Sequence, residues 1–500
     1  MAGRHSDNEP PYKPTDFRTA LGWSYVMYGG QYVITTIITL ILAAILGPSA
    51  FGVVAMAMVY VMFIQMLLRQ GMVPAIIQKR GLRPSHLDSA FWLIVATAIV
   101  LTCAGLLLSG WWAMVNRTPD LEPVINVLSA LIPIQSLIVV QEAVLNRDMN
   151  FRGLAVRTNS SALIGGGVGL VLAFTGFGVW ALVAQHIIKS LSDVVVLWTL
   201  SDWRPRLRFS WPAARDLLGF SASASLAGIG TFVNNRSDAL LIGLFFGPTA
   251  VGLYRLAGRF VDMLIDLTVR ALQAVSLPEL SRLQDDPRRF AERSVKIINS
   301  SALFALPAFG LLAGASDALI DLVGEEWAPA STPLKILCVV GAVRALTMFM
   351  GPMLSAIGRP QILALLTWSS ALLSGGSFVL AGVLLADAPI ADQVTGIALA
   401  RMAMFSSVVF FLAVWLMLRN SDVSLRSLGR AVGPSTLAAS VGFVLTQLLA
   451  SVIGTSFGDV VRLIIIVVPS SIVTGLLLVR IEPLMRGLVV SATQRLRTGP

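Results

Sequence analysis

The sequence predicts an all-α integral membrane protein with about 14 transmembrane helices, arranged as two parallel six-helix lobes and two C-terminal helices, with both termini cytoplasmic. Three observations support this fold class. The 500 residues are 56% hydrophobic and 13% charged, whereas roughly a quarter of a soluble domain is charged. Apolar residues recur in blocks of roughly 20, the length that crosses a bilayer core. Lysine and arginine gather in alternate connections.

The apolar blocks divide the chain into segments. We expect a cytoplasmic N-terminal segment (1–20), an N-lobe of helices 1 to 6 (21–200), a basic cytoplasmic inter-lobe linker (201–216), a C-lobe of helices 7 to 12 (217–418), a cytoplasmic loop (419–430), helices 13 and 14 (431–480) and a basic cytoplasmic tail (481–500). The helices begin near Leu21, Phe51, Ala90, Leu121, Leu154, Phe177, Leu217, Val251, Ser294, Thr332, Pro360, Ile390, Ala431 and Asp459. Each connection is too short to fold a soluble catalytic domain.

The distribution of basic residues sets the predicted orientation. With the N-terminus inside, only Arg117 and Arg462 of the 37 lysines and arginines fall in outward connections. Positive residues are retained on the cytoplasmic side of bacterial membrane proteins. The bias therefore predicts an even number of crossings. Because the basic residues are spread over many short loops, the net charge of +10 does not indicate a nucleic-acid partner.

One short motif occurs twice. GPSAFG at 47–52 and GPTAVG at 247–252 lie 200 residues apart and share four of six positions. Each separates two predicted helices, so the repeating unit is six helices. An even number per unit gives both halves the same orientation, with a substrate path between them. The alternative is that Gly-Pro turns simply recur in short helical hairpins.

Several charges fall within the predicted helices. Arg236 lies 12 residues before Pro248 and Arg259 lies 11 after it, which places both about 17 Å along their helices, near mid-membrane. The predicted eighth helix carries its charges at helical spacing on one face, at Arg255, Arg259, Asp262, Asp266 and Arg270. A charge at the bilayer centre costs at least about 2.5 kcal/mol, so each requires a partner or a function.

These charges allow two interpretations. They could be internal ion pairs that tie helices together, such as Arg259 with Asp238 and Lys189 with Asp193. They could also line a cationic, water-filled cavity that suits an anionic head group, because guanidinium groups bind phosphate bidentately. In the second interpretation the predicted substrate ligands are Arg259, Arg236, Arg344, Arg401 and Lys189. The predicted coupling or gating residues are Asp262, Asp266 and Asp238.

The sequence contains no pattern typical of an enzyme. No lysine follows a glycine, so a phosphate-binding P-loop is not predicted. The three histidines are far apart in the sequence and form no metal-binding spacing. We therefore predict a secondary transporter with no cofactor and no metal site.

The chain resembles the bacterial polysaccharide and lipopolysaccharide export flippases of the multidrug/oligosaccharidyl-lipid/polysaccharide (MOP) superfamily. The likeness rests on LGP at 46–48, FG at 51–52, IIQK at 76–79, SAFW at 89–92, NRDMNF at 146–151, GFGVWAL at 176–182, WRPR at 203–206, DALLIG at 238–243, GLY at 252–254, PELSRL at 278–283 and AIGRP at 356–360. These motifs occur in order and span most of the chain.

The resemblance implies a protein of the bacterial inner membrane that moves undecaprenyl-diphosphate-linked oligosaccharides between leaflets by alternating access. It also implies H⁺ or Na⁺ as a coupling ion and functional partners in the glycan polymerisation machinery. Three other functions stay open, and one of them is a flippase for the peptidoglycan precursor. A drug antiporter of the same superfamily would use a similar fold, and a membrane polymerase or ligase would need larger outward loops than this sequence has.

Overall fold

The computed structural model describes residues 17–79, 81–148, 150–420, 423–453 and 458–486. Within these ranges every regular element is a helix. The predicted N-terminal segment (1–20) and basic tail (481–500) lie largely outside the described residues. The chain forms two compact units. Unit 1 comprises Met1–Leu46 and Ala57–Phe232, and unit 2 comprises Gly47–Met56 and Val233–Pro500.

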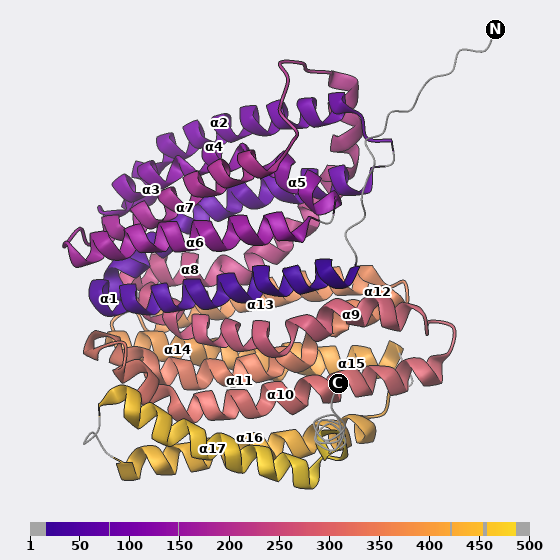
Figure 1. Ribbon diagram of the computed structural model, residues 1–500. Coiled ribbons are helices and arrows are strands. Elements are labelled where there is room, and N and C mark those ends of the chain that lie inside the picture. The colour runs from indigo at the N-terminus through magenta and orange to yellow at the C-terminus, as the bar shows by residue number, and fades with distance from the viewer. Residues whose placement is uncertain (1–16, 80, 149, 421–422, 454–457, 487–500) are drawn as a thin grey trace. The chain divides into compact units, whose positions relative to one another are not determined.

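The helices of unit 1 come from the first half of the chain (Figure 1). They are α1 (Phe17–Gln78) apart from Gly47–Met56, α2 (Pro84–Val115), α3 (Leu121–Ser129), α4 (Leu131–Ser136), α5 (Val139–Arg147), α6 (Phe151–Phe174), α7 (Val179–Leu200) and the first part of α8 (Trp211–Thr268). The helix predicted from Leu121 is thus three short helices, not one. Pro133 within α4 lacks a backbone N–H donor, which weakens the helix locally.

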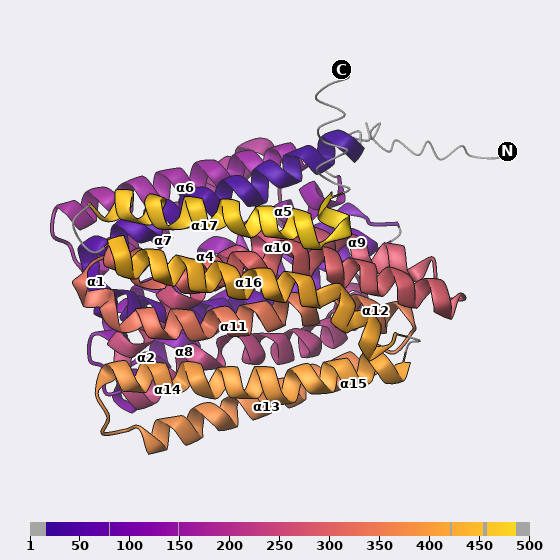
Figure 2. The ribbon, with the colours of Figure 1, turned by 90° about the horizontal axis from the view of Figure 1, so that it is seen from below.

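Unit 2 contains the rest of α8 and all later helices (Figure 2). They are α9 (Arg270–Ser281), α10 (Pro287–Asp321), a 3₁₀ helix (Glu325–Ala330), α11 (Ser331–Thr347), α12 (Met350–Ala356), α13 (Pro360–Leu384), α14 (Ile390–Ala403), a π-helix (Met404–Val409), α15 (Phe410–Asn420), α16 (Leu425–Ile453) and α17 (Asp459–Ile481).

Ten of the described helices are long and apolar enough to cross a membrane, or 11 if the pair Leu121–Ser136 and Val139–Arg147, bent by 42°, is one span. The prediction was about 14. Part of the difference arises because α1 and α8 each comprise two helices that meet at a kink, at Gly47 and at Gly247, where the backbone is not helical. The polytopic all-helical class is confirmed. The number of 14 spans and the cytoplasmic termini stay predictions.

The two bends have the same backbone conformation. Gly47 has φ 71° and ψ 172°, and Gly247 has φ 79° and ψ −175°. This left-handed region is open to glycine and strained for residues with a Cβ. A proline follows each glycine and cannot continue the hydrogen-bond ladder of the preceding helix. The sequence repeat is therefore also a repeat of local structure.

The two repeated motifs also pack against each other within unit 2. A Cβ added at Gly52 would overlap the carbonyl oxygen of Pro248, and a Cβ added at Gly252 would overlap the carbonyl oxygen of Pro48. The contact is reciprocal, as in a two-fold symmetric interface in which residue i meets j and j meets i. Only glycine allows two backbones to approach so closely.

Small residues also attach α16 to α10, beside which it runs (Figures 1 and 2). Gly310 and Gly314 lie one turn apart on α10. A Cβ at Gly310 would overlap the carbonyl oxygen of Ala439, and one at Gly314 would lie 2.9 Å from that of Phe443. Apolar helices gain little hydrophobic energy from association in lipid, so such close packing through small residues holds them together.

Candidate functional site

The bend in α8 gathers the predicted intramembrane charges of unit 2. Arg236 and Asp238 precede Gly247, while Arg255, Arg259 and Asp262 follow it. The charges of Arg255, Asp238, Asp262 and Arg259 all act on the Arg236 guanidinium. The similar depth predicted for Arg236 and Arg259 in the membrane stays a prediction. Arg344 on α11 and Arg401 on α14 complete the group, which we call the unit 2 arginine cluster.

Arg401 and Asp238 form the most buried ion pair of this cluster. The Arg401 Nη1 to Asp238 Oδ2 distance is 3.3 Å, and the two side chains are 12% and 8% exposed. The guanidinium carbon also lies 5.9 Å from the Phe378 ring centroid and 5.8 Å from that of Phe405. An ion pair this enclosed by aromatic rings ties α8 to α14.

The other two predicted coupling residues are paired more openly. Arg344 Nη1 lies 3.0 Å from Asp262 Oδ1, and the Asp262 side chain is 56% exposed. Asp266 lies 2.7 Å from Arg270, whose side chain is 64% exposed. Each of the three predicted aspartates therefore has an arginine partner. The interpretation as internal ion pairs holds for these contacts, although Asp238 contacts Arg401, which the sequence did not suggest.

The cluster nevertheless keeps a surplus of positive charge. It holds Arg236, Arg255, Arg259, Arg344 and Arg401 against Asp238 and Asp262. Among the side chains that the structure describes, neither Arg236 nor Arg255 makes an ion pair. Both lie on α8, in the candidate membrane span Arg236–Thr268, where an unbalanced charge is costly.

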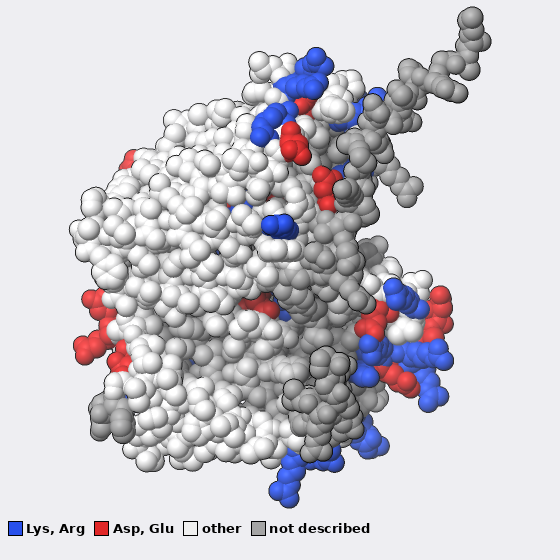
Figure 3. Space-filling view, in the orientation of Figure 1, with Lys and Arg blue, Asp and Glu red and all other residues white. Residues whose placement is uncertain are grey.

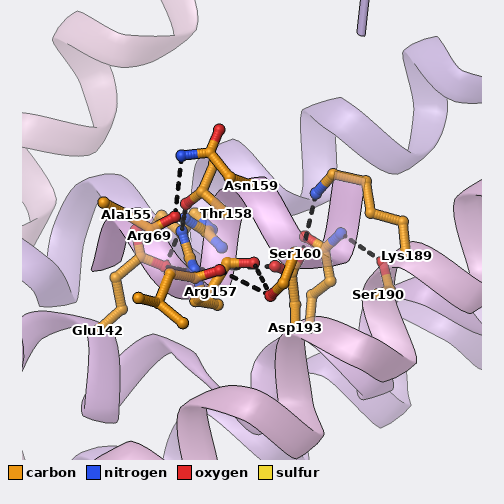
Figure 4. Close-up of polar contacts among 12 residues, drawn as sticks. Arg69, Glu142, Ala155, Arg157, Thr158, Asn159, Ser160, Lys189, Ser190 and Asp193 are labelled. Atoms are coloured by element: carbon orange, nitrogen blue, oxygen red, sulfur yellow. Dashed lines mark hydrogen bonds and ion pairs between the residues drawn. The ribbon is translucent and has the colours of Figure 1, made fainter. Parts of the chain in front are cut away.

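Close packing of α6 on α7 builds a second polar region, in unit 1. A Cβ at Gly165 would lie 2.6 Å from the Lys189 Cβ, and one at Gly169 would lie 2.9 Å from the Gln185 Cβ. Glycines one turn apart let the two helices approach, as in other small-residue helix contacts in membranes. This approach brings Arg157 of α6 beside Asp193 of α7 (Figure 4).

The charges of this region form an alternating chain, which we call the unit 1 ion network (Figure 4). Arg69 lies 3.0 Å and Arg157 lies 3.1 Å from Glu142 Oε2. Arg157 Nε lies 3.7 Å from Asp193 Oδ1, and Lys189 Nζ lies 2.9 Å from Asp193 Oδ2. The central side chains are 6–17% exposed, whereas the terminal cations Arg69 and Lys189 are 33% and 26% exposed.

Sequence analysis found one end of this network and missed the rest. The Lys189–Asp193 pair was considered, but Arg69, Glu142 and Arg157 were not singled out because each lies near the end of an apolar block. The sequence did contain a pattern that could have revealed two of them. Glu142 and Arg157 lie at similar distances on either side of one short connection, so antiparallel helices on its two sides would place them at one depth. Among the described residues, no group of three or more His, Cys, Asp or Glu could hold a metal ion.

Comparison with known sequences places the chain in a family. Residues 41–332 match the model of a family described as polysaccharide biosynthesis protein. The succinoglycan biosynthesis transport protein ExoT of Rhizobium meliloti is 28% identical over 344 residues, which cover 69% of this chain and 70% of ExoT. The lipopolysaccharide biosynthesis protein WzxC of Escherichia coli is 26% identical over 329 residues, which cover 64% of this chain and 66% of WzxC.

Solved structures establish the same fold at low sequence identity. The lipid II flippase MurJ in an inward closed conformation has a TM-score of 0.71 at 12% identity, covering 92% of this chain and 99% of MurJ. An inward-facing multidrug transporter of the MATE family, within the MOP superfamily, has a TM-score of 0.60 at 15% identity, covering 78% of this chain and 95% of its own.

ExoT is named as a transport protein, MurJ as a flippase and the MATE protein as a transporter. The apolar helices and the family match make it a multi-pass protein of the bacterial inner membrane. The chain belongs to the polysaccharide biosynthesis protein family, and its fold is that of the flippases and transporters of the MOP superfamily.

Proposed function

We propose that the protein is a flippase that moves undecaprenyl-diphosphate-linked oligosaccharide repeat units across the inner membrane by alternating access, for exopolysaccharide, O-antigen or capsule biosynthesis. The observation that carries the proposal is the positive surplus of the unit 2 arginine cluster within apolar helices. The family match and the likeness to ExoT and WzxC support a polysaccharide substrate.

The chemistry of the substrate explains the arginines. Moving a glycan and a diphosphate through hydrocarbon without polar contacts is prohibitively unfavourable. Guanidinium groups bind phosphate oxygens bidentately and stay protonated, so Arg236 and Arg255 would hold the diphosphate while the lipid chain stays in the bilayer. Arg259, Arg344 and Arg401 of the same cluster would join them when their present interactions are released, and Lys189 would bind substrate within unit 1 when Asp193 is neutralised.

The paired aspartates suggest how transport is driven. Binding of H⁺ or Na⁺ to a carboxylate weakens its attraction to the adjacent arginine, which is then available for phosphate. Asp262 is the most accessible of the three aspartates, at 56% exposure, and we assign it the first exchange. Asp266 and Asp238 would follow. The translocated repeat units would pass to the glycan polymerisation machinery.

Substitution of the two arginines without an ion pair tests this function. Arg236→Gln and Arg255→Gln are each expected to lower glycan export by about tenfold or more, because each removes a charge-assisted hydrogen bond to the diphosphate. Export is measured in a deletion strain that carries the variant. Folding should be unaffected, since removing an unbalanced intramembrane charge does not destabilise the protein.

Arg288→Gln is the matched control, because Arg288 lies on α10 with an 89% exposed side chain and a surface partner. It should export like the wild type. Wild-type export by the Arg236→Gln/Arg255→Gln double variant would rule out this substrate site. Drug resistance in a sensitised host, lost in the same variants while export persists, would instead favour the drug antiporter.

Our topology of 14 spans with cytoplasmic termini is part of the proposal. In a Cys103→Ser background, Glu325→Cys is expected to react with an impermeant thiol reagent in intact cells, because Glu325 lies in the predicted outward connection between the ninth and tenth helices. Arg426→Cys should react only after lysis, because it lies in the predicted cytoplasmic loop. Both positions are exposed, so access to the reagent depends on the side of the membrane. The reverse pattern would invert the topology.

A further inference from the structure

The connection between α7 and α8 is an extended segment, and we call residues Ser201–Trp211 the strap. It contains no helix before Trp211. Ser201 is buried at the end of α7, whereas Arg206, Leu207, Arg208 and Phe209 are all exposed. The strap is therefore a surface segment whose backbone must find hydrogen-bond partners outside a helix.

Three hydrogen bonds hold the strap backbone on the first turns of α2. The Trp92 indole N–H donates to the carbonyl oxygen of Arg206 at 2.8 Å. The Arg206 backbone N–H donates to Asp88 Oδ1 at 3.1 Å, and the Ser210 N–H donates to Ser89 Oγ at 2.9 Å. Asp88 and Ser89 are buried. The strap thus has a defined inner side, formed by its polar backbone groups.

The outer side of the strap presents large apolar residues. Leu207 is 90% exposed, Phe209 is 53% exposed and Trp211 is 58% exposed. The backbone turns at Leu207, where the Arg208 N–H donates to the Arg206 carbonyl oxygen at 2.7 Å, and the rings of Phe209 and Trp211 lie together with their centroids 6.4 Å apart. An exposed group of large apolar side chains on a segment with a fixed backbone marks an interaction surface.

Two arginines accompany these apolar residues. Arg206 and Arg208 are exposed, and Figure 3 shows basic side chains on the surface over this connection. Arg204 has a different role. Its guanidinium donates to the backbone carbonyl oxygens of Trp203, Ser201 and Trp198 and so closes the end of α7. Arg206 and Arg208 are the cations that accompany the apolar surface.

The position of the strap indicates what covers it. It begins directly after Leu200, the last residue of one candidate membrane span, and it lies on the start of another, Pro84–Val115. The end of a span lies at the bilayer interface, where tryptophan and other amphipathic side chains are enriched. Arginines beside apolar residues at this level meet lipid phosphates, and anionic lipids attract each basic residue.

We propose that the strap is a binding site for anionic phospholipid of the surrounding membrane. Leu207, Phe209 and Trp211 insert at the boundary between head groups and acyl chains, while Arg206 and Arg208 contact lipid phosphates. The strap joins the two repeated halves of the chain, so bound lipid fixes the connection between them at the interface. This proposal does not depend on the transported substrate.

A probe at Leu207 tests membrane contact. Leu207→Cys in a Cys103→Ser background is labelled with an environment-sensitive fluorophore and reconstituted in vesicles of phosphatidylcholine with about 30% phosphatidylglycerol. We expect blue-shifted emission that is quenched by lipids with spin labels near the head group. The same label at Glu325→Cys is the control and should stay water-exposed. The proposal would be overturned if emission from the label at position 207 were quenched only by aqueous iodide. It would also be overturned if the label were buried against another protein.

Substitution of the arginines tests the preference for anionic lipid. Purified protein in detergent is titrated with phosphatidylglycerol or phosphatidylcholine, and thermal stability is followed. Each arginine at an anionic surface contributes roughly fivefold in affinity, so Arg206→Gln/Arg208→Gln should raise the half-saturating phosphatidylglycerol concentration at least about tenfold. The three hydrogen bonds to α2 use only backbone atoms of the strap, so the variant should fold.

The matched control is Arg288→Gln/Arg289→Gln, in which two arginines that are 89% and 76% exposed are removed from α10. It should keep the wild-type titration. Equal titration curves for the strap variant and the wild type would overturn the anionic-lipid site. Both experiments measure lipid contact without glycan transport, so failure of the proposed function would leave their outcome unchanged.

Discussion

Gly52→Ala and Gly252→Ala are each expected to lower the amount of folded protein in the membrane severely. In each variant the new Cβ would overlap a proline carbonyl oxygen of the other repeated motif. A backbone atom cannot move aside as the end of a flexible side chain can, so the helices must separate. We expect the free energy of unfolding to fall by about 3 kcal/mol or more, which is the upper end of the range for overpacking substitutions. The measurement is the thermal unfolding of purified protein together with its amount in membranes.

A glycine in an open position on the same helix supplies the control for this prediction. Gly258 lies on the same helix as Gly252, and a Cβ there would meet no atom within 4 Å. Gly258→Ala should therefore leave stability unchanged or raise it slightly, because alanine favours a helix interior. Because the contact is reciprocal, Gly52→Ala and Gly252→Ala should be similarly severe. If either variant were as stable as Gly258→Ala, the close contact between the two motifs would be incorrect.

Arg157→Met is expected to have the second largest effect. The Arg157 guanidinium contacts both carboxylates of the unit 1 ion network, and its side chain is 12% exposed. Its removal leaves Asp193, which is 6% exposed, with Lys189 alone and leaves Glu142 with Arg69 alone. Removing one partner from a buried ion pair costs about 3–5 kcal/mol, because the remaining charge has lost its compensation. Thermal unfolding and glycan export should both decline.

A double variant separates this charge effect from lost packing. Arg157→Met/Asp193→Asn removes one cation and one anion, so its stability should exceed the value predicted by adding the two single variants. Arg288→Met is the surface control, since an exposed ion pair contributes at most about 1 kcal/mol. If the loss of stability in the double variant equalled the sum of the losses in the two single variants, Arg157 and Asp193 would not act as a pair.

Most of the fold class could be read from the sequence because bilayer insertion depends on local composition. An apolar block of sufficient length crosses lipid whatever its neighbours are, and the helix satisfies its own backbone. The Gly-Pro motifs were equally readable, because glycine tolerates positive φ and proline interrupts the helical ladder at once. The helix from Leu121 was harder to predict, since Pro133 and the packing of its neighbours break it into three short helices.

The candidate site likewise has features that the sequence could predict and features that it could not. The sequence predicted similar depths for Arg236 and Arg259 from their distances to one turn, which is a local property. It did not pair Asp238 with Arg401, because these residues are 163 positions apart and a contact between distant helices is set by how they pack. Arg69, Glu142 and Arg157 were missed because each lies near the end of an apolar block, where a charge does not stand out.

By itself the sequence determined that the chain is helical, lies in a membrane, repeats a motif and belongs with polysaccharide exporters. Only the tertiary structure decided which arginines are neutralised, which stay in surplus, and where the strap lies. The physical reason is the distance along the chain between the residues that interact. Helix formation and insertion depend on residues that are close in the chain, whereas an ion pair or a backbone contact depends on which helices lie side by side.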